Sequence, residues 1–214
     1  MVCVMTYTIY GDLGSGAFSA EAALAEAGAD YAFHTVSLER NEQRKPAYLA
    51  INPSGKMPAL KLPSGEIVTE SLAIVLTIAE RFAQSGLLPV DLDERAQALR
   101  WLSFMASEIY PMVEISDYPD RFVPKGDAAK ALKLKAQERI RERLLIIENA
   151  LAGPWILKCG FTAADLYAAM ILRWRATIGR EWLEAGHIPK LLALRDAVAA
   201  RPRIAPIWAR HFPN

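Results

Sequence analysis

The hydrophobic and polar positions of the first 80 residues alternate between strand-like and helix-like patterns. Four short runs of β-branched and aromatic residues, each bounded by turn formers, predict strands at 7–10, 31–36, 57–62 and 67–68. An alanine-rich stretch ending at Gly28 predicts a helix over 18–27, and apolar spacing predicts another over 70–82. A short helical turn is expected at 45–51. The order β-α-β-α-β-β-α predicts one mixed sheet with helices on its faces.

The pattern after residue 93 is helical throughout. Apolar residues recur at intervals of three and four and predict helices over 94–113, 127–151, 162–177 and 188–200. The predicted buried stripe of the first helix is Leu99, Leu102, Ala106, Ile109 and Val113. Thr162 and Asp165 predict a capping box at the start of the third. The prolines within 202–213 predict little regular structure in the tail.

These patterns divide the chain into two domains. We predict an α/β domain over 1–82, a linker over 83–92 and an all-helical domain over 93–214. With 214 residues, the chain can bury a sizeable core without a disulfide or metal staple. Its 52% hydrophobic and 23% charged residues are ordinary globular values, which excludes a disordered chain.

Charge and targeting signals exclude several classes of protein. The formal net charge of +1 argues against nucleic acid or an anionic lipid surface as a partner. No apolar run reaches 18 residues, so no membrane span is expected. The first residues, Met1 to Thr6, lack the basic region of a signal peptide. We therefore expect a cytoplasmic protein.

Cysteine and histidine usage offers little chemistry. Cys3 and Cys159 form neither a C-x-x-C pair nor part of a metal-ligand set, so we expect no disulfide framework and no metal. Cys159 is predicted to be a packed thiol rather than a nucleophile. His34, His187 and His211 are scattered without metal-ligand spacing, and we assign them no function.

A first motif runs from Asn52 to Leu60 and reads Asn-Pro-Ser-Gly-Lys-Met-Pro-Ala-Leu. Pro58 stands just inside a predicted strand, where proline interrupts the ladder of hydrogen bonds. One hypothesis is a cis Met57-Pro58 bond, with the N–H and C=O of Met57 turned toward an extended peptide. The alternative is a plain turn with a trans proline at the start of the strand.

A second motif, Thr69-Glu70-Ser71, opens an apolar helix. The simple interpretation is an N-cap followed by an acidic first turn. The functional alternative is that Ser71 and the free backbone N–H groups bind a carboxylate while Glu70 pairs with an amine.

A third motif is the loop from Gly11 to Gly16 between the first strand and the first helix. It lacks the G-K-[ST] of a phosphate loop and the full G-x-G-x-x-G pattern. It is either a flexible turn or a site where the Ser15 hydroxyl, next to the positive helix end, stabilises a thiolate.

Together with Phe161-Thr162-Ala-Ala-Asp165, these motifs resemble the cytosolic glutathione S-transferase superfamily. Gly153 to Leu157 and Trp101 to Phe104 are similar to its bacterial members. The resemblance covers nearly the whole chain. It implies a thioredoxin-like N-terminal domain, an all-helical C-terminal domain, a homodimer and a glutathione site at the border of the domains.

The resemblance implies glutathione-binding roles for Met57, Pro58, Glu70, Ser71, Lys45 and Gln43. The Met57 backbone would bond the cysteinyl unit, and Glu70 and Ser71 would hold the γ-glutamyl end. Lys45 or Gln43 would meet the glycyl carboxylate, with Lys45 preferred for its charge.

The resemblance leaves the thiol-activating residue open. Ser15 falls where the serine classes place theirs and Tyr10 where the tyrosine classes do, with Ser19 a third possibility. We favour Ser15 because a turn beside a helix N-terminus is the better anion site. Gly16 occupies the position of the cysteine classes, which argues against mixed-disulfide chemistry.

The electrophile site is expected on the helix over 94–113. Bacterial relatives often carry a His-Lys pair after Ser107-Glu108, whereas this chain has Ile-Tyr-Pro. An apolar wall is instead predicted from Met105, Tyr110, Met112 and Tyr118. The alternative for these residues is ordinary core packing.

The sequence thus predicts a glutathione transferase that joins the glutathione thiolate to a small, largely apolar electrophile, in detoxification. Glutathione is the co-substrate and no metal is expected. One alternative is another glutathione-dependent enzyme on the same fold: an isomerase, dehalogenase, lyase or peroxidase. The other is a non-catalytic module that binds a partner protein, for which a damaged glutathione site would be expected.

Overall fold

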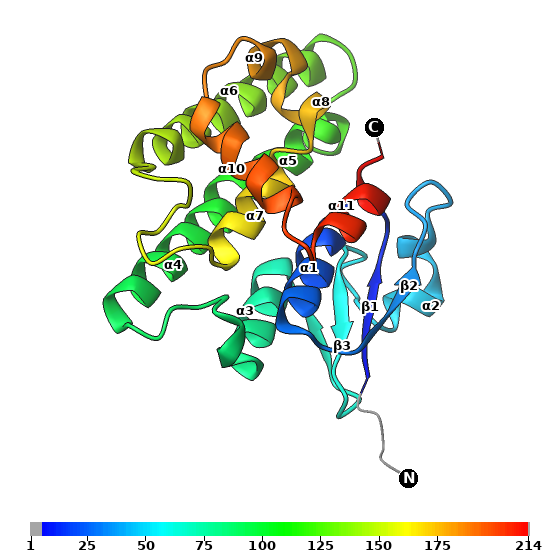
Figure 1. Ribbon diagram of the computed structural model, residues 1–214. Helices are drawn as coiled ribbons and strands as arrows, with labels where there is room; N and C mark the ends of the chain where they lie inside the picture. Colours follow the sequence, from blue (N-terminus) through cyan, green and yellow to red (C-terminus); the bar gives the residue numbers. More distant parts are fainter. Residues whose placement is uncertain (1–5, 214) are drawn as a thin grey trace. The chain divides into compact units, whose positions relative to one another are not determined.

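The computed structural model describes residues 6–213 and divides them into two compact units (Figure 1). The first unit combines residues 6–88 with 199–213, and the second spans 89–198. The strands are β1 (Tyr7–Gly11), β2 (Tyr31–Thr35), β3 (Ala59–Lys61) and β4 (Ile67–Thr69). The helices of the first unit are α1 (Ala17–Ala27), α2 (Pro46–Leu49), α3 (Ser71–Arg81) and α11 (Ala205–His211). Those of the second unit are α4 (Leu92–Phe104), α5 (Tyr110–Asp117), α6 (Asp127–Ala150), α7 (Ala163–Ile171), α8 (Arg175–Ile178), α9 (Arg180–Glu184) and α10 (Pro189–Ala199).

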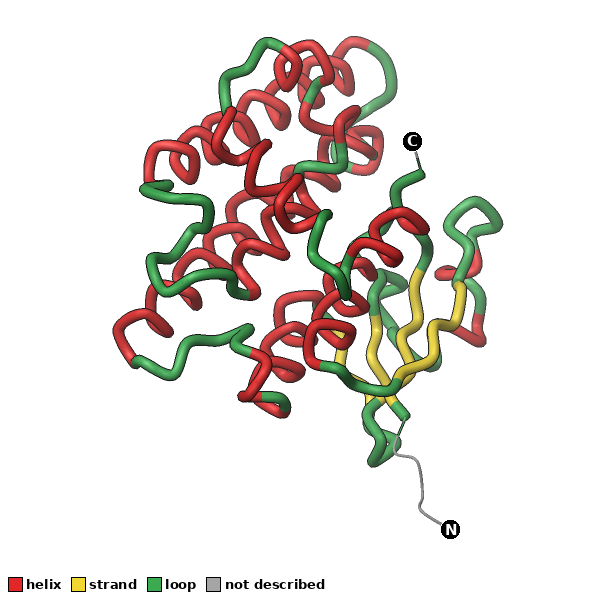
Figure 2. The backbone as a smooth tube through the Cα atoms, viewed as in Figure 1, coloured by secondary structure: helices red, strands yellow, loops and turns green. Residues whose placement is uncertain are grey.

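The described strands form a four-stranded mixed sheet in the order β2-β1-β3-β4, drawn in yellow in Figure 2. β1 is parallel to β2 and antiparallel to β3, and β3 is antiparallel to β4. Along β1, the side chains of Tyr7 and Ile9 are buried, whereas Thr8 and Tyr10 on the opposite face are partly exposed. The thioredoxin-like sheet predicted from the sequence is confirmed.

The core of the first unit lies between the sheet and its helices. Ile9 and Leu60 from the sheet, Phe18 and Leu24 from α1, and Ile74 from α3 are fully buried. α1 ends at Gly28, whose left-handed conformation lets its N–H reach the carbonyl of Ala25, as the sequence predicted. α11 packs against α1, and the two helices are side by side in Figure 1.

The helical unit is built around α7, whose residues are all buried. The predicted capping box starts this helix. The Thr162 hydroxyl accepts a hydrogen bond from the Ala164 N–H, and Asp165 accepts bonds from the N–H groups of Thr162 and Ile156. Burial raises the pKa of Asp165 to about 6, although these donors favour its ionised form. No helix within residues 6–213 is both long and apolar enough to cross a membrane.

The first long helix of this unit differs from its prediction. It begins at Leu92, passes through a π-helical turn at Met105–Ile109 and continues as α5 to Asp117. The wider turn shifts the phase of the buried face, because its hydrogen bonds span five residues instead of four. Of the predicted stripe, Leu102, Ile109 and Val113 are buried, whereas Leu99 is 37% exposed and Met105 is buried instead of Ala106.

The third predicted helix is shorter than expected. The helix predicted over 162–177 ends at Ile171, where the N–H groups of Arg173 and Trp174 bond to carbonyls three residues back and tighten the last turn. The short helices α8 and α9 follow, separated by Gly179.

The tail is also more regular than predicted. It forms α11, because Pro206 stands in the first helical turn, where its missing N–H costs no hydrogen bond. The structure places residues 199–213 with the α/β unit, whereas the predicted boundary assigned the whole tail to the helical domain. The expectations for residues 1–5, including Cys3, lie outside the described residues.

Candidate active site

The register of the sheet aligns the three motifs in one row. Tyr10 near the end of β1 pairs with Ala59 of β3, and Ala59 pairs with Thr69 of β4. Ala59 directly follows Pro58, and Thr69 directly precedes Glu70. The end of β1, the Met-Pro motif and the start of α3 therefore meet across three adjacent strands.

The peptide bond between Met57 and Pro58 is cis, so the trans-proline alternative is wrong. Neither the N–H nor the carbonyl of Met57 has a hydrogen-bond partner among the described residues. Met57 itself is half-buried. Its main-chain donor and acceptor are thus available to a bound peptide.

A network of hydrogen bonds fixes the loop before Met57. The Lys56 carbonyl accepts bonds from the Tyr48 hydroxyl at 2.8 Å and from the Asn52 side-chain amide at 2.7 Å. The Asn52 side-chain oxygen in turn accepts bonds from the N–H and hydroxyl of Ser54. Burial raises the pKa of Tyr48 to about 12, so its hydroxyl stays a donor at neutral pH.

Gly55 brings this loop against the turn at residues 42–44. Its φ is +61°, and a Cβ at this position would lie 3.0 Å from the Gln43 carbonyl oxygen and 3.0 Å from an Arg44 guanidinium nitrogen. Only glycine combines this conformation with so close an approach. The tight packing holds Gln43 and Lys45 near the Met57 loop.

The two candidates for a carboxylate contact differ in their surroundings. The Lys45 side chain is 56% exposed, and its ammonium lies 3.7 Å from a carboxylate oxygen of Glu42. Gln43 is 8% exposed, and its side-chain oxygen has no hydrogen-bond partner within residues 6–213. Sequence reasoning missed Arg44, whose guanidinium lies against Gly55.

Glu70 adopts a rare backbone conformation at the start of α3. Its φ of +67° and ψ of +117° lie in the left-handed half of conformational space, which costs a non-glycine residue about 1–3 kcal/mol. The Glu70 side chain is exposed, and Ser71 begins the helix. The first N–H groups of α3 are therefore next to a carboxylate that can pair with an amine.

Several hydrogen bonds fix the loop between β1 and α1. The Ser15 hydroxyl donates to the Asp12 carbonyl at 2.6 Å and accepts a bond from the Ala17 N–H at 3.2 Å. The Asp12 carboxylate accepts bonds from the N–H groups of Leu13 and Leu38. The buried Gly16 N–H has no partner among the described residues. A backbone donor at the positive end of α1 is thus unsatisfied next to Ser15.

The other two hydroxyl candidates contrast with Ser15. Tyr10 is partly exposed on the sheet face opposite Ile9, with its ring 5.2 Å from that of His34. Its hydroxyl has no hydrogen-bond partner within the described chain. Ser19 is fully buried and donates to the Gly16 carbonyl, so it is closed to a ligand.

The predicted electrophile wall lies in the helical unit. Met105 is fully buried, which fits the alternative of core packing. Tyr110 packs against Tyr167 and Trp174, Met112 is half-buried, and Tyr118 is exposed beneath the guanidinium of Arg121. The wall stays a prediction for Tyr110, Met112 and Tyr118.

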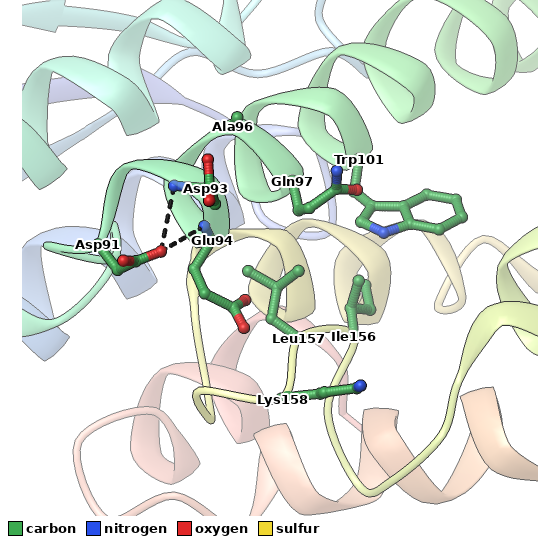
Figure 3. Close-up of a pocket in the computed structure, with 9 residues that line it drawn as sticks. All are labelled: Asp91, Asp93, Glu94, Ala96, Gln97, Trp101, Ile156, Leu157 and Lys158. Carbon is green, nitrogen blue, oxygen red and sulfur yellow. Dashed lines mark hydrogen bonds between the residues drawn. The ribbon is translucent and has the colours of Figure 1, made fainter.

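A hollow of about 510 Å³ opens elsewhere in the helical unit (Figure 3). Its lining residues are Asp91, Asp93, Glu94, Ala96, Gln97, Trp101, Ile156, Leu157 and Lys158. The predicted wall residues do not line it. The Asp91 carboxylate caps α4 by accepting the N–H groups of Asp93 and Glu94, and Figure 3 draws both bonds. The Asp91 carboxylate is therefore explained as the N-cap of α4, without a ligand in the hollow.

The prediction that Cys159 is a packed thiol is wrong, because its side chain is exposed. It stands in a surface loop one residue from the isolated bridge between Leu157 and Gly160. The slight loss of hydration at its sulfur and the nearby Glu94 carboxylate raise the pKa of Cys159, which disfavours the reactive thiolate. Within residues 6–213, no three His, Cys, Asp or Glu side chains form a group that could hold a metal.

The sequence did not identify two residues whose side chains form hydrogen bonds with the backbone of the site loops. Tyr48 fixes the Lys56 carbonyl, and His211 accepts a hydrogen bond from the Gly14 N–H at 3.2 Å. The sequence contained one signal, since Glu21 places a carboxylate among the alanines of the first half of α1. That carboxylate is fully buried and contacts His211.

The fold and the aligned motifs define a protein with a thioredoxin-like unit and a helical unit. The family model of the glutathione S-transferase N-terminal domain matches residues 5–80, and that of the C-terminal domain matches residues 99–202. The chain belongs to the glutathione S-transferase family.

Individual relatives agree with this assignment. The chain is 27% identical over 194 residues to glutathione S-transferase GstA of Escherichia coli, covering 89% of this chain and 92% of that one. It is 38% identical over 167 residues to a glutathione S-transferase of Arabidopsis thaliana, covering 76% and 77%. The crystal structure of a glutathione transferase homolog from Sulfitobacter with bound glutathione is similar, with a TM-score of 0.88, 25% identity and coverage of 97% and 99%.

Proposed function

We propose that this protein is a glutathione transferase that joins the glutathione sulfur to a small, largely apolar electrophile. The thiol loses its proton, and the thiolate sulfur then forms a bond to an electrophilic carbon, which releases a leaving group or takes up a proton after addition. The observation that carries the proposal is the row of Tyr10, Ala59 and Thr69. It aligns the thiol-activating loop, the Met57 backbone and the start of α3 beside one another.

Glutathione would bind as an extended peptide along this row. The unpaired N–H and carbonyl of Met57, before Pro58, would bond the cysteinyl unit. The Glu70 carboxylate would pair with the γ-glutamyl amine, and Ser71 with the helix N-terminus would hold its carboxylate.

The glycyl carboxylate would lie near the turn at residues 42–44. Lys45 supplies the charge, and the unpaired amide oxygen of Gln43 marks a buried side chain whose amide can turn to donate. A Lys45→Ala variant tests this contact. We expect about 3- to 10-fold weaker glutathione binding, the cost of one exposed charge pair.

Thiol activation is assigned to Ser15. A free thiol has a pKa of about 8.5, and each unit of depression corresponds to about 1.4 kcal/mol. A depression of about two units would make the thiolate dominant at pH 7. The Ser15 hydroxyl would turn from the Asp12 carbonyl toward the sulfur, and the unsatisfied Gly16 N–H would add a second donor.

The test is calorimetric glutathione binding by wild type, Ser15→Ala and Tyr10→Phe between about pH 5 and pH 9. We expect wild type and Tyr10→Phe to release the thiol proton near neutral pH, whereas Ser15→Ala releases it about one to two pH units higher. The opposite pattern would move the role to Tyr10. If wild type does not bind glutathione, the enzyme proposal is wrong and the partner-binding module replaces it.

The proposal includes a homodimer and an electrophile beside Tyr110 and Met112. The support is the family membership and the partial exposure of both side chains. Light scattering after size exclusion tests the dimer, and a monomer at micromolar concentration would contradict it. Met112→Ala tests the wall, with a raised KM for apolar electrophiles and an unchanged affinity for glutathione.

A further inference from the structure

The last helix of the chain reaches the loop that holds Ser15. His211, at the end of α11, is almost completely buried, and its Nδ1 accepts a hydrogen bond from the Gly14 N–H at 3.2 Å. Its Nε2 lies 2.7 Å from a carboxylate oxygen of Glu21 in α1. The His211 imidazole thus connects the loop before α1 with a side chain in the middle of α1.

These contacts define the tautomer of the imidazole. A backbone N–H can only donate, so Nδ1 must be the unprotonated acceptor. The ring proton is then on Nε2, where it donates to Glu21. The hydrogen bond to the carboxylate therefore selects the tautomer that can hold Gly14.

The surroundings keep this ring in place. The rings of Phe18, Phe33 and Phe212 lie 5.5, 5.7 and 5.9 Å from it. The ionisable groups facing Glu21 and the ring are Arg210 from α11 and Tyr31 from β2, both of which donate to the other Glu21 oxygen. Burial alone would raise the pKa of Glu21, but the hydrogen bond from His211 and the charge and hydrogen bond of Arg210 lower it, so the carboxylate stays ionised.

The bond to His211 holds Gly14, the residue before Ser15. Gly14 precedes Ser15 and adopts a left-handed φ of +75°. Glycine reaches this conformation easily, but an unrestrained glycine would also sample many others. On its other side, Ser15 is fixed by α1. Holding the Gly14 N–H therefore defines the direction from which the Ser15 hydroxyl enters the site.

We propose that His211 is a positioning residue for glutathione chemistry: through the Gly14 N–H, it holds the Ser15 loop in the geometry that stabilises the thiolate. This inference rests on the proposed function. It assigns the C-terminal helix a role in the site, although His211 itself touches neither glutathione nor the reacting sulfur.

Two variants separate the hydrogen bond made by Nδ1 from the one made by Nε2. In His211→Asn, the amide oxygen can take the place of Nδ1 and still accept from Gly14, while the reach to Glu21 is lost. In His211→Gln, the longer amide can take the place of Nε2 and donate to Glu21, while the acceptor for Gly14 is lost. Both variants replace a buried imidazole by an amide, so each controls for the other.

The main readout is the ultraviolet titration of the bound glutathione thiolate. We expect His211→Asn to titrate as wild type and His211→Gln to titrate about one pH unit higher. With a standard electrophile at pH 7, kcat of His211→Gln should fall about threefold, as the thiolate fraction does, while KM for glutathione changes less than about twofold. Equal titration in both variants would overturn the proposal, as would a loss of glutathione affinity without a change in titration.

A second pair of measurements needs no glutathione. Amide hydrogen exchange at Gly14 in the ligand-free protein should be at least about tenfold faster in His211→Gln than in His211→Asn. Should His211→Gln fail to fold, the nitrogen NMR spectrum of wild type decides, because a proton on Nδ1 of His211 would overturn the inference. If wild type binds no glutathione, the proposed function fails first. Normal binding with unchanged exchange and titration would refute the role of His211 alone.

Discussion

The packing at Gly55 predicts a sharp difference between two glycine substitutions. Gly55 and Gly86 both belong to the first unit and both have left-handed φ values, +61° and +71°. A Cβ at Gly86 would meet no atom within 4 Å, whereas one at Gly55 would lie 3.0 Å from the Gln43 carbonyl oxygen. Gly86→Ala therefore isolates the cost of the backbone conformation, and Gly55→Ala adds a steric cost.

The magnitudes follow from these two costs. A left-handed conformation costs an alanine about 1–2 kcal/mol. Alanine also reduces the conformational entropy of the unfolded chain, which stabilises the folded state by about 0.4–1 kcal/mol. This gain is the same in both variants and cancels in the comparison. At Gly55 the close contact is with backbone, which cannot rotate away, so overpacking adds about 1–3 kcal/mol. Gly55→Ala should therefore be less stable than Gly86→Ala by about 1–3 kcal/mol.

Urea unfolding measures this difference. With an m-value of about 2–3 kcal/mol per molar urea, the midpoint of Gly55→Ala should lie roughly 0.3–1.5 M below that of Gly86→Ala. Gly55→Ala should also weaken glutathione binding, because the displaced loop leads directly to Met57, while Gly86→Ala should bind as wild type. Equal midpoints and equal affinities would refute the reasoning.

Three further predictions concern buried polar groups. Glu21 has a pKa below its ordinary 4.5, because its hydrogen bonds and the charge of Arg210 outweigh burial. The stability it contributes is present above that pH and is lost as the pH falls through the folded-state pKa, so Glu21→Gln should flatten the acid limb of urea-measured stability. Thr162→Ala should lower the free energy of unfolding by about 1–2 kcal/mol and raise the pKa of Asp165 further, whereas Thr162→Ser should keep the cap. Tyr48→Phe should cost about 0.5–1.5 kcal/mol in urea unfolding, since it removes one of two donors to the Lys56 carbonyl.

Local patterns were sufficient for most of the α/β unit. β1 is a run of aromatic and β-branched residues that stops at Gly11, α1 ends at a glycine, and the turn between β3 and β4 contains Pro63 and Gly65. Each of these signals acts within a few residues, so the sequence alone contains them. The cis bond before Pro58 was one of two hypotheses, and the structure decides between them.

Predictions failed where a few residues admit more than one local arrangement. The π-helical turn at Met105–Ile109 changes which residues are buried, yet its sequence is compatible with an ordinary α-helix. Pro206 breaks a helix in its interior but is accepted in its first turn, and the pattern alone did not distinguish these cases. Exposure of Cys159 depends on the path of its loop, which has no periodic signal.

The geometry of the candidate site depends on contacts that no local pattern contains. Asp12 accepts a bond from Leu38, Gly14 donates to His211, and Gly55 meets Gln43. The first two of these contacts join segments separated by 26 and 197 residues. The motif residues can therefore be present and correctly spaced while the site is still misshapen, because conformation at Ser15 and Met57 is imposed from outside the motifs. Substitutions at these supporting contacts should alter thiolate formation or glutathione affinity although none of the substituted residues touches the ligand.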